Sequence, residues 1–502
     1  MKIVIYQTSD VHGYIYPTNY LNPNGVGFLK IATFIEEDQK KYDASLKIEN
    51  GDFIQGSAFA NYLATKNNDR SDLLIQALNS LNFDVFILGN HEFNYGVEHL
   101  TKAYKQVENK ILAANILGLP FKTKPYNIFD YQGFKIGVIG LTTKYIPNWE
   151  DAEKISGLTF LDVVDTYQKY EAELTQLCDL IIVSYHGGFE ADFFETSVFK
   201  LSEENQAGAL LKKFNSIDIL LTGHQHQVIQ QKIDDAIVSM PGVNGSYLTK
   251  IVIDTKTKKI EHELIDIAMY TLENHPNTEK IFHQSHQEFL LYLDKVIGQL
   301  DEDISIDDDF HARLYGHPFI NLTHQIQQEI SNADISVACL FDNSKGFSKN
   351  ITVRDVLLNF PFPNTLKVLK MTGQQIKNVI EKSLTYFIIE NENIAINPKF
   401  LYPKPLNYNY DLFYGLEYTV DLTKPEFQRI VKLEKDHEPF DLEKNYLVVL
   451  TNYRVNNKDI YPEYSMAEVV KEINIEINEI VLNYFLKHKK VTISKQKSII
   501  IK

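Results

Sequence analysis

The chain has 502 residues, of which 44% are hydrophobic and 23% charged, and no residue type dominates its composition. This length exceeds one ordinary hydrophobic core, so we expect two domains, and the apolar content excludes long disordered stretches. The formal net charge is −16, from 66 acidic and 50 basic side chains. A field of that sign repels nucleic-acid backbones and favours a small-molecule partner over a long nucleic acid.

The sequence predicts no membrane partner, because no apolar run approaches the roughly 20 residues needed to cross a bilayer. The N-terminus, MKIVIYQTSD, has a short apolar stretch that stops at polar residues. It lacks the long apolar segment and the cleavage site of a signal peptide. We therefore expect a cytoplasmic protein, or an exported one if a leader has been removed.

The first half of the chain alternates short apolar runs with helical patterns, which is typical of α/β units. The runs that predict buried strands are 3–6, 46–48, 85–88, 136–139, 180–183 and 217–221. Apolar residues at three- and four-residue spacing predict helices over 28–42, 72–81 and 159–177. From 229 to 268 the pattern alternates as in strands, and its last part predicts a hairpin.

The pattern changes after residue 272. The segment 275–300 predicts one long helix, and the acidic stretch DEDISIDDD follows it. We therefore expect a first domain over 1–272, a connecting helix and linker over 273–305, and a second domain over 306–502. In the second domain we expect helices over 318–331 and 372–383, strands over 366–371 and 447–450, and a partly frayed tail after Lys487.

Five of the predicted strands end in side chains that can bind metal ions. These side chains are Asp10 and His12, Asp52, Asn90 and His91, His186, and His224 and His226. In an open α/β sheet the strand ends on one side form the ligand-binding edge, so these side chains should converge. Burying so many imidazoles and carboxylates together without a cation would be costly.

The residue types indicate the metal and the chemistry. Imidazole, carboxylate and amide oxygen without thiolate suit Zn²⁺, Mn²⁺, Co²⁺ or Fe²⁺. So many ligands exceed one tetrahedral centre, whereas two divalent metal ions that share a carboxylate use them all. Two-metal sites of this kind generate hydroxide at neutral pH and catalyse in-line displacement at phosphorus.

The motifs DxH, GD, GNHE, a distant His and GHxH occur in this order and resemble those of the calcineurin-like metallophosphoesterases. Within that superfamily the chain is similar to the 5′-nucleotidase/2′,3′-cyclic-nucleotide 2′-phosphodiesterase family. The second half also matches, through ITVRDVLLNFPFPNTLKVLKMTGQQI, NYNYDLFYGLEYTVD and VVLTNYR. The resemblance implies an α/β protein with a four-layer αββα catalytic domain followed by a smaller α/β nucleotide-binding domain.

The resemblance also implies roles for single residues. One metal ion would be bound by Asp10, His12, Asp52 and His226, and the other by Asp52, Asn90, His186 and His224. His91 would contact the phosphate and stabilise negative charge in the transition state, or else orient Asn90. In the second domain, Tyr410 and Tyr453 match the two aromatic residues that hold the nucleobase by stacking.

Some positions differ from the classical 5′-nucleotidase pattern. Those enzymes have an Asp three residues after the GNHE histidine, where this chain has Asn94, and a neutral amide cannot stabilise an imidazolium as a carboxylate does. Asn94 and the two tyrosines are similar to the 2′,3′-cyclic-nucleotide 2′-phosphodiesterase/3′-nucleotidase branch. Against that branch, TNYRVNNKD lacks the glycine pair that usually follows the second aromatic residue.

The leading hypothesis is therefore hydrolysis of nucleotide phosphoesters, above all of 2′,3′-cyclic nucleotides and 3′-monophosphates, by metal-activated hydroxide. Enzymatic alternatives on the same site are a 5′-nucleotidase and a UDP-sugar hydrolase. A nucleotide-binding protein with an inactive site is the non-enzymatic alternative, although every ligand position is filled. A nuclease for duplex DNA is disfavoured by the net charge and by the base-stacking domain.

Overall fold

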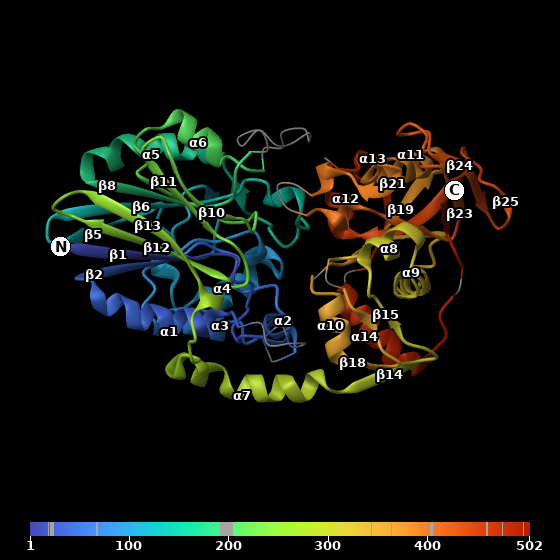
Figure 1. The fold of residues 1–502 in the computed structure, drawn as a ribbon, viewed down its shortest axis with the longest axis horizontal. Helices are drawn as coiled ribbons and strands as arrows, with labels where there is room; N and C mark the ends of the chain where they lie inside the picture. The colour runs from blue at the N-terminus through green and yellow to red at the C-terminus, as the bar shows by residue number, and fades with distance from the viewer. Residues whose placement is uncertain are drawn as a thin grey trace. The chain divides into compact units, whose positions relative to one another are not determined.

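The computed structural model describes residues 1–18, 20, 25–66, 69–190, 204–342, 344–362, 364–401, 405–457, 460–473, 475–494 and 496–501. The chain divides into two compact units, Met1–Phe289 and Leu290–Lys502, which are described separately (Figure 1).

The described part of unit 1 contains two large sheets, besides a two-stranded sheet of β4 (Ile116–Leu117) and β7 (Thr159–Phe160). The first has five strands in the order β13 (Lys259–Asp266), β12 (Tyr247–Asp254), β1 (Lys2–Thr8), β2 (Ala44–Glu49) and β3 (Val85–Phe86). The second has six strands in the order β10 (Val228–Ile233), β11 (Ala236–Pro241), β9 (Ile219–Leu221), β8 (Leu180–His186), β6 (Phe134–Thr142) and β5 (Tyr126–Tyr131). Strands β1, β2 and β3 run parallel to one another, as do β6, β8 and β9.

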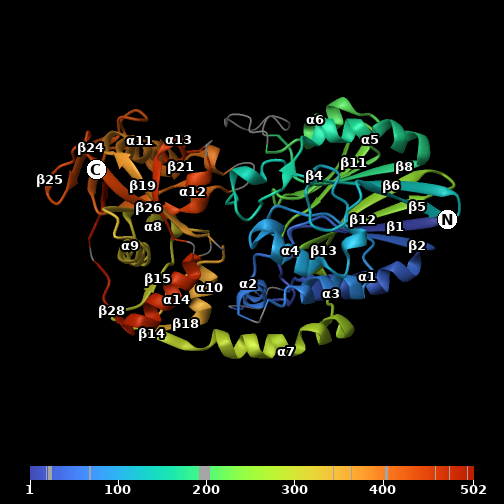
Figure 2. The same ribbon diagram turned by 180° about the vertical axis from the view of Figure 1, so that it is seen from behind.

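Helices cover the outer face of each sheet, which gives the expected four layers (Figures 1 and 2). Helices α1 (Phe28–Asp38) and α3 (Asp72–Ser80) lie beside the first sheet, and α5 (Val163–Leu177) and α6 (Ala207–Lys213) beside the second. Alternate strand residues from both sheets, such as Ile5, Ile48 and Ile182, form one core between them. The other face of the second sheet packs on α5 and α6 through residues such as Val183 and Leu210.

Two predicted helices of this region have different limits. The predicted helix 159–177 begins only at Val163, where Asp162 caps it by accepting a hydrogen bond from the N–H of Asp165. The residues Thr159–Phe160 form strand β7 instead. The predicted helix 275–300 is two elements, α7 (Pro276–Leu293) and strand β14 (Val296–Leu300), which pairs with β18 (Asn350–Thr352).

Unit 2 is a smaller α/β unit. Its main sheet has the order β22 (Leu412–Tyr414), β16 (Ile335–Ala338), β26 (Asn445–Thr451), β19 (Leu366–Thr372) and β27 (Glu468–Ile473). Helices α9 (Pro318–Ser331) and α11 (Gly373–Ser383) match their predicted ranges closely. The tail after Lys487 is more ordered than expected, because β28 (Lys490–Val491) pairs with β14 and β29 (Ile499–Ile501) pairs with β23 (Glu417–Val420).

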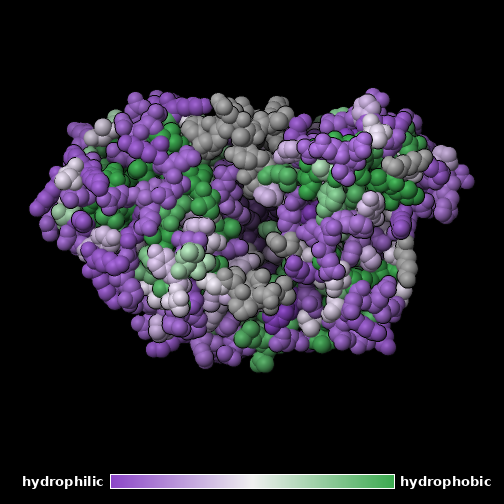
Figure 3. Space-filling view, in the orientation of Figure 1, coloured by the Kyte–Doolittle hydropathy of each residue, from purple (hydrophilic) through white to green (hydrophobic). Residues whose placement is uncertain are grey.

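The surface in Figure 3 is mainly hydrophilic, with hydrophobic side chains in scattered patches. Among the described residues, no helix combines the length and the apolar character needed to span a bilayer.

Candidate functional site

The predicted metal ligands of unit 1 lie where parallel strands end. Asp10 and His12 follow β1, Asp52 follows β2, Asn90 follows β3, His186 ends β8, and His224 and His226 follow β9. Parallel pairing within each sheet brings the carboxyl ends of these strands to one edge.

The backbone at five of these positions is strained. The residues with left-handed φ are Asp10 (54°), His12 (52°), Asp52 (58°), His224 (70°) and His226 (58°). Such conformations cost about 1–3 kcal/mol each in non-glycine residues and cluster at functional sites. These backbone conformations therefore lower the free energy of unfolding, which is typical of residues held in place for function.

Three of the histidines are oriented by their outer ring nitrogens. His12 Nδ1 lies 2.9 Å from the carbonyl oxygen of Gln55, and His186 Nδ1 lies 2.7 Å from that of Asn50. A carbonyl can only accept, so each of these Nδ1 atoms carries a proton and Nε2 is the ring nitrogen that faces the other ligands. His224 is turned the other way, with Nε2 2.8 Å from Glu204 Oε1 and Nδ1 facing inward.

The inner atoms meet in two neighbouring groups. In the first, His226 Nε2 lies 3.1 Å from His12 Nε2 and 3.5 Å from Asp10 Oδ1. In the second, His186 Nε2 lies 3.1 Å from Asp52 Oδ2 and 3.2 Å from Asn90 Oδ1. His224 Nδ1 lies 2.8 Å from the same Asn90 oxygen. Each group is compact enough for its donors to share one cation.

The electrostatics of these groups fit divalent cations. Burial raises the pKa of Asp10 to about 6 and lowers that of His12 to about 4. Burial also opposes the charge of His186, but Asp52 and Asp10 outweigh it and raise the pKa of His186 to about 10. Asp52 Oδ2 is buried and faces His186 Nε2 at 3.1 Å. Imidazole nitrogens that face buried carboxylate and amide oxygens are the donor set expected around Zn²⁺, Mn²⁺, Co²⁺ or Fe²⁺.

Glycines permit the close approach of the ligand loops. A Cβ on Gly89 would lie 2.3 Å from Asp52 Oδ1, and one on Gly223 would lie 2.6 Å from Asp10 Oδ2. Any side chain at these positions would displace the carboxylates.

Glu92 ties two of the loops together, a role that sequence reasoning missed. Its carboxylate is fully buried and accepts hydrogen bonds from the N–H groups of Asp52 (2.8 Å), Phe53 (2.8 Å) and Gly89 (2.7 Å). Glu92 thus links the loop after β2 to the loop after β3. The GNHE motif contains this residue, but no pattern in the sequence shows what the carboxylate bonds.

His91 lies beside both groups. Its ring centroid is 5.0 Å from that of His12, and its backbone N–H donates to Asp52 Oδ1 (2.7 Å). Its Nδ1 is 2.7 Å from Asn94 Oδ1, so the predicted pair of His91 and Asn94 is in contact.

In unit 2 the structure corrects one of the predicted stacking residues. Tyr410 is only 1% exposed, and its ring stacks on Tyr386 (5.0 Å, 25°) and contacts Phe387 edge-on. A nucleobase cannot reach a ring enclosed in this way. Tyr410 is therefore a core residue, because its side chain points inward from the loop.

Tyr408, two residues earlier, is more accessible than Tyr410. It is half-buried, as is Tyr453, and the two ring centroids lie 6.4 Å apart at 69°. The buried Arg454 fixes this pair, since it follows Tyr453 in α12 (Asn452–Asn456) and donates to the carbonyl oxygen of Tyr408. Arg454 also pairs with Asp411 (2.8 Å). The repeated aromatic spacing of NYNYD gave no signal for choosing between Tyr408 and Tyr410.

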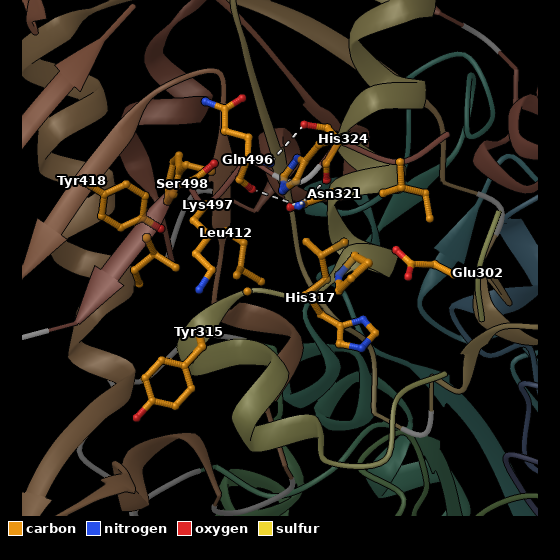
Figure 4. Close-up of a pocket in the computed structure, with 17 residues that line it drawn as sticks. Glu302, Tyr315, His317, Asn321, His324, Leu412, Tyr418, Gln496, Lys497 and Ser498 are labelled. Carbon is orange, nitrogen blue, oxygen red and sulfur yellow. Dashed lines mark hydrogen bonds between the residues drawn. The ribbon is translucent and has the colours of Figure 1, made fainter. Parts of the chain in front are cut away.

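Unit 2 also contains a cavity of about 300 Å³ between the start of α9 and the C-terminal tail (Figure 4). Its wall includes Lys497, Leu412 and the buried His324, whose Nε2 has no hydrogen-bond partner among the described residues. None of the predicted site residues lines this cavity.

Comparisons with known proteins agree with this geometry. Residues 3–228 match the model of the calcineurin-like phosphoesterases, and residues 296–466 match that of the 5′-nucleotidase C-terminal domain. A putative 5′-nucleotidase from Staphylococcus aureus, solved with alpha-ketoglutarate, is 34% identical over the whole of both chains, with a TM-score of 0.92.

Two curated bacterial relatives are more distant. A 2′,3′-cyclic-nucleotide 2′-phosphodiesterase/3′-nucleotidase from Haemophilus influenzae is 25% identical over 96% of this chain and 84% of its own length. A trifunctional nucleotide phosphoesterase from Bacillus subtilis is 25% identical over 98% of this chain, which spans only 38% of that relative. The full-length structural match and the two family models together show that the chain belongs to the 5′-nucleotidase family of calcineurin-like metallophosphoesterases.

Proposed function

We propose that this chain hydrolyses phosphoesters of small nucleotides with a pair of divalent metal ions, most efficiently 2′,3′-cyclic nucleotides and 3′-monophosphates. The observation that carries the proposal is the meeting of seven ligand residues in two groups at one edge of unit 1. The activities named for the relatives are of the same class.

The two groups assign ligands to two cations. Asp10, His12 and His226 would hold one ion, and Asn90, His186 and His224 the other, with Asp52 shared between them. When bound, such a pair neutralises phosphate charge and lowers the pKa of water to near neutrality. Glu92 holds the shared carboxylate in place through the peptide N–H groups of its loop.

His91 is the residue that would contact the phosphate. Its Nδ1 is taken by Asn94, which leaves Nε2 to face the phosphate, and a ring protonated at both nitrogens would donate from Nε2 to a phosphate oxygen as negative charge develops there. The hydrogen bond from its N–H to Asp52 fixes the backbone of His91 relative to the shared ligand.

Tyr408 and Tyr453 would hold the base. Two stacking contacts of about 3.5 Å each place rings about 7 Å apart around a planar base. The separation of 6.4 Å needs only a small widening and a rotation of one ring. Stacking tolerates different bases, so we expect weak discrimination among them.

Asn94 favours the cyclic-nucleotide branch, and the Haemophilus influenzae relative has that activity in its name. A 5′-nucleotidase is the second candidate, because the Staphylococcus aureus protein carries that name at higher identity.

Steady-state kinetics with added Mn²⁺ on 2′,3′-cAMP, 3′-AMP, 5′-AMP and a UDP-sugar distinguish the candidates. We expect kcat/KM for the first two to exceed that for 5′-AMP by at least about tenfold, a difference of about 1.4 kcal/mol in transition-state binding. If 5′-AMP is the best substrate, the chain is a 5′-nucleotidase. If metal-loaded protein turns over none of the four, it is a nucleotide-binding protein instead.

A further inference from the structure

A buried carboxylate lies behind the pair of His91 and Asn94. The side-chain amide nitrogen of Asn94 donates a short hydrogen bond to Glu150 Oε1. The side chain of Glu150 is only 10% exposed, and its Oε2 lies 3.9 Å from the ammonium nitrogen of Lys154. Burial raises the pKa of Glu150, while Lys154, His91 and the hydrogen bond from Asn94 act in the opposite direction. His91, Asn94 and Glu150 thus form a continuous chain of hydrogen bonds.

The donors and acceptors in this chain allow one arrangement. A carboxylate can only accept, so Glu150 takes the NH₂ end of the Asn94 amide. The carbonyl end must then face His91, and a carbonyl also only accepts. Nδ1 of His91 therefore carries a proton, and Nε2 is the ring nitrogen left for the substrate.

The segment that carries Glu150 is itself anchored at the site. Trp149, the preceding residue, stacks on the ring of His224 with centroids 5.3 Å apart at 30°. The N–H of Glu150 donates to the carbonyl oxygen of Ile146 (3.0 Å). Glu150 is thus held in place by backbone and ring contacts that do not involve Asn94.

We propose that Glu150 is a positioning residue that orients the Asn94 amide and, through it, holds His91 with Nε2 directed to the phosphate. The proposal rests on the proposed function of His91. The neutral amide of Asn94 can then orient His91 in place of the carboxylate of classical 5′-nucleotidases, because the carboxylate of Glu150 in turn orients the amide.

Exchanging the amide of Asn94 and the carboxylate of Glu150 tests this chain of hydrogen bonds. In Asn94→Asp, the amide N–H that donates to Glu150 is replaced by a second buried carboxylate, so kcat should fall by about 10–100-fold, the cost typical for residues that orient a reactive group. In the double variant Asn94→Asp/Glu150→Gln, the glutamine amide can donate to the new aspartate. We expect its kcat to return to within about threefold of the wild-type value.

Glu150→Gln alone should lose less activity than Asn94→Asp, because its amide can still present a carbonyl to Asn94. Glu153→Gln, an exposed site three residues away, is the matched control and should match the wild-type protein. Metal content and thermal midpoint, measured on every variant, show whether each one is folded and loaded.

The expected result is that the second substitution rescues the first in kcat with KM little changed. If the losses of the single variants multiply in the double variant, or if Asn94→Asp is fully active, Glu150 does not orient Asn94. If wild-type protein turns over no nucleotide phosphoester at all, the proposed function fails, and that result is distinct from a failed rescue.

Discussion

The strand-end loops of unit 1 and the tyrosine pair of unit 2 are built in different ways. In unit 1, five of the seven predicted ligands sit on strained backbone, and three of the ligand histidines have an outer ring nitrogen whose partner orients the ring, as with His186 and Asn50. In unit 2, Tyr408 and Tyr453 are half-buried rings whose planes are not parallel. The ligand loops of unit 1 thus form a rigid centre suited to phosphate chemistry. The tyrosine pair of unit 2 forms an adaptable surface suited to bases of several kinds.

The largest effect should come from Asp52→Ala, which removes the carboxylate that we propose both cations share. We expect both metal ions to be lost and activity to fall by at least about 10³-fold. Elemental analysis and turnover of 2′,3′-cAMP measure the two quantities. Retention of two equivalents of metal would show that Asp52 does not bridge.

The next largest effect should be on stability, from Tyr410→Ala. The fully buried ring stacks on Tyr386, so its removal should cost about 3–5 kcal/mol in the free energy of unfolding of unit 2. Tyr410→Phe is the control and should be nearly neutral, because the buried hydroxyl has no hydrogen-bond partner in the part of the chain that the structure describes. Chemical denaturation measures both, and a near-neutral Tyr410→Ala would mean that the ring is not part of the core.

Tyr408→Ala should act on binding instead. Loss of one stacking ring should weaken nucleotide binding by about 1–3 kcal/mol, which would appear as a higher KM. The KM for a base-free ester such as glycerol 2-phosphate should not change. Tyr408→Phe should keep the wild-type KM. Equal losses on both substrates would assign Tyr408 a structural role and remove the distinction between the two regions.

The last effect appears only at acidic pH and concerns His324 in unit 2. Burial lowers the pKa of His324 to about 3, whereas an unfolded histidine titrates near 6.5. The neutral, buried ring of His324 therefore makes its full contribution to the free energy of unfolding above pH 6.5. This contribution is lost progressively as the pH falls towards 3. At pH 5 the loss should be about 2 kcal/mol.

His324→Gln should remove this part of the acid sensitivity, whereas the exposed His437→Gln should not. Hydrogen exchange of unit 2 amides at pH 7.5 and pH 5 measures the difference. An unchanged pH dependence in His324→Gln would mean that His324 is protonated in the folded state.

The sequence predicted the two regions unequally, for a physical reason. The positions of Asp10, Asp52 and His186 follow from buried strands, whose apolar runs are unambiguous and whose parallel ends must share an edge. Tyr408 and Tyr410 lie in an irregular loop, where no periodicity says which ring turns inward. The tertiary partners Glu92, Glu150 and Arg454 depend on loop conformations that residue patterns do not encode.

The most direct test of the account is the metal stoichiometry of the wild-type chain. Protein treated with a chelator and then titrated with Mn²⁺ in a calorimeter should bind two ions per chain, and phosphoesterase activity should return as they bind. Binding of one ion or none, with activity unchanged by the metal, would contradict the two-cation centre.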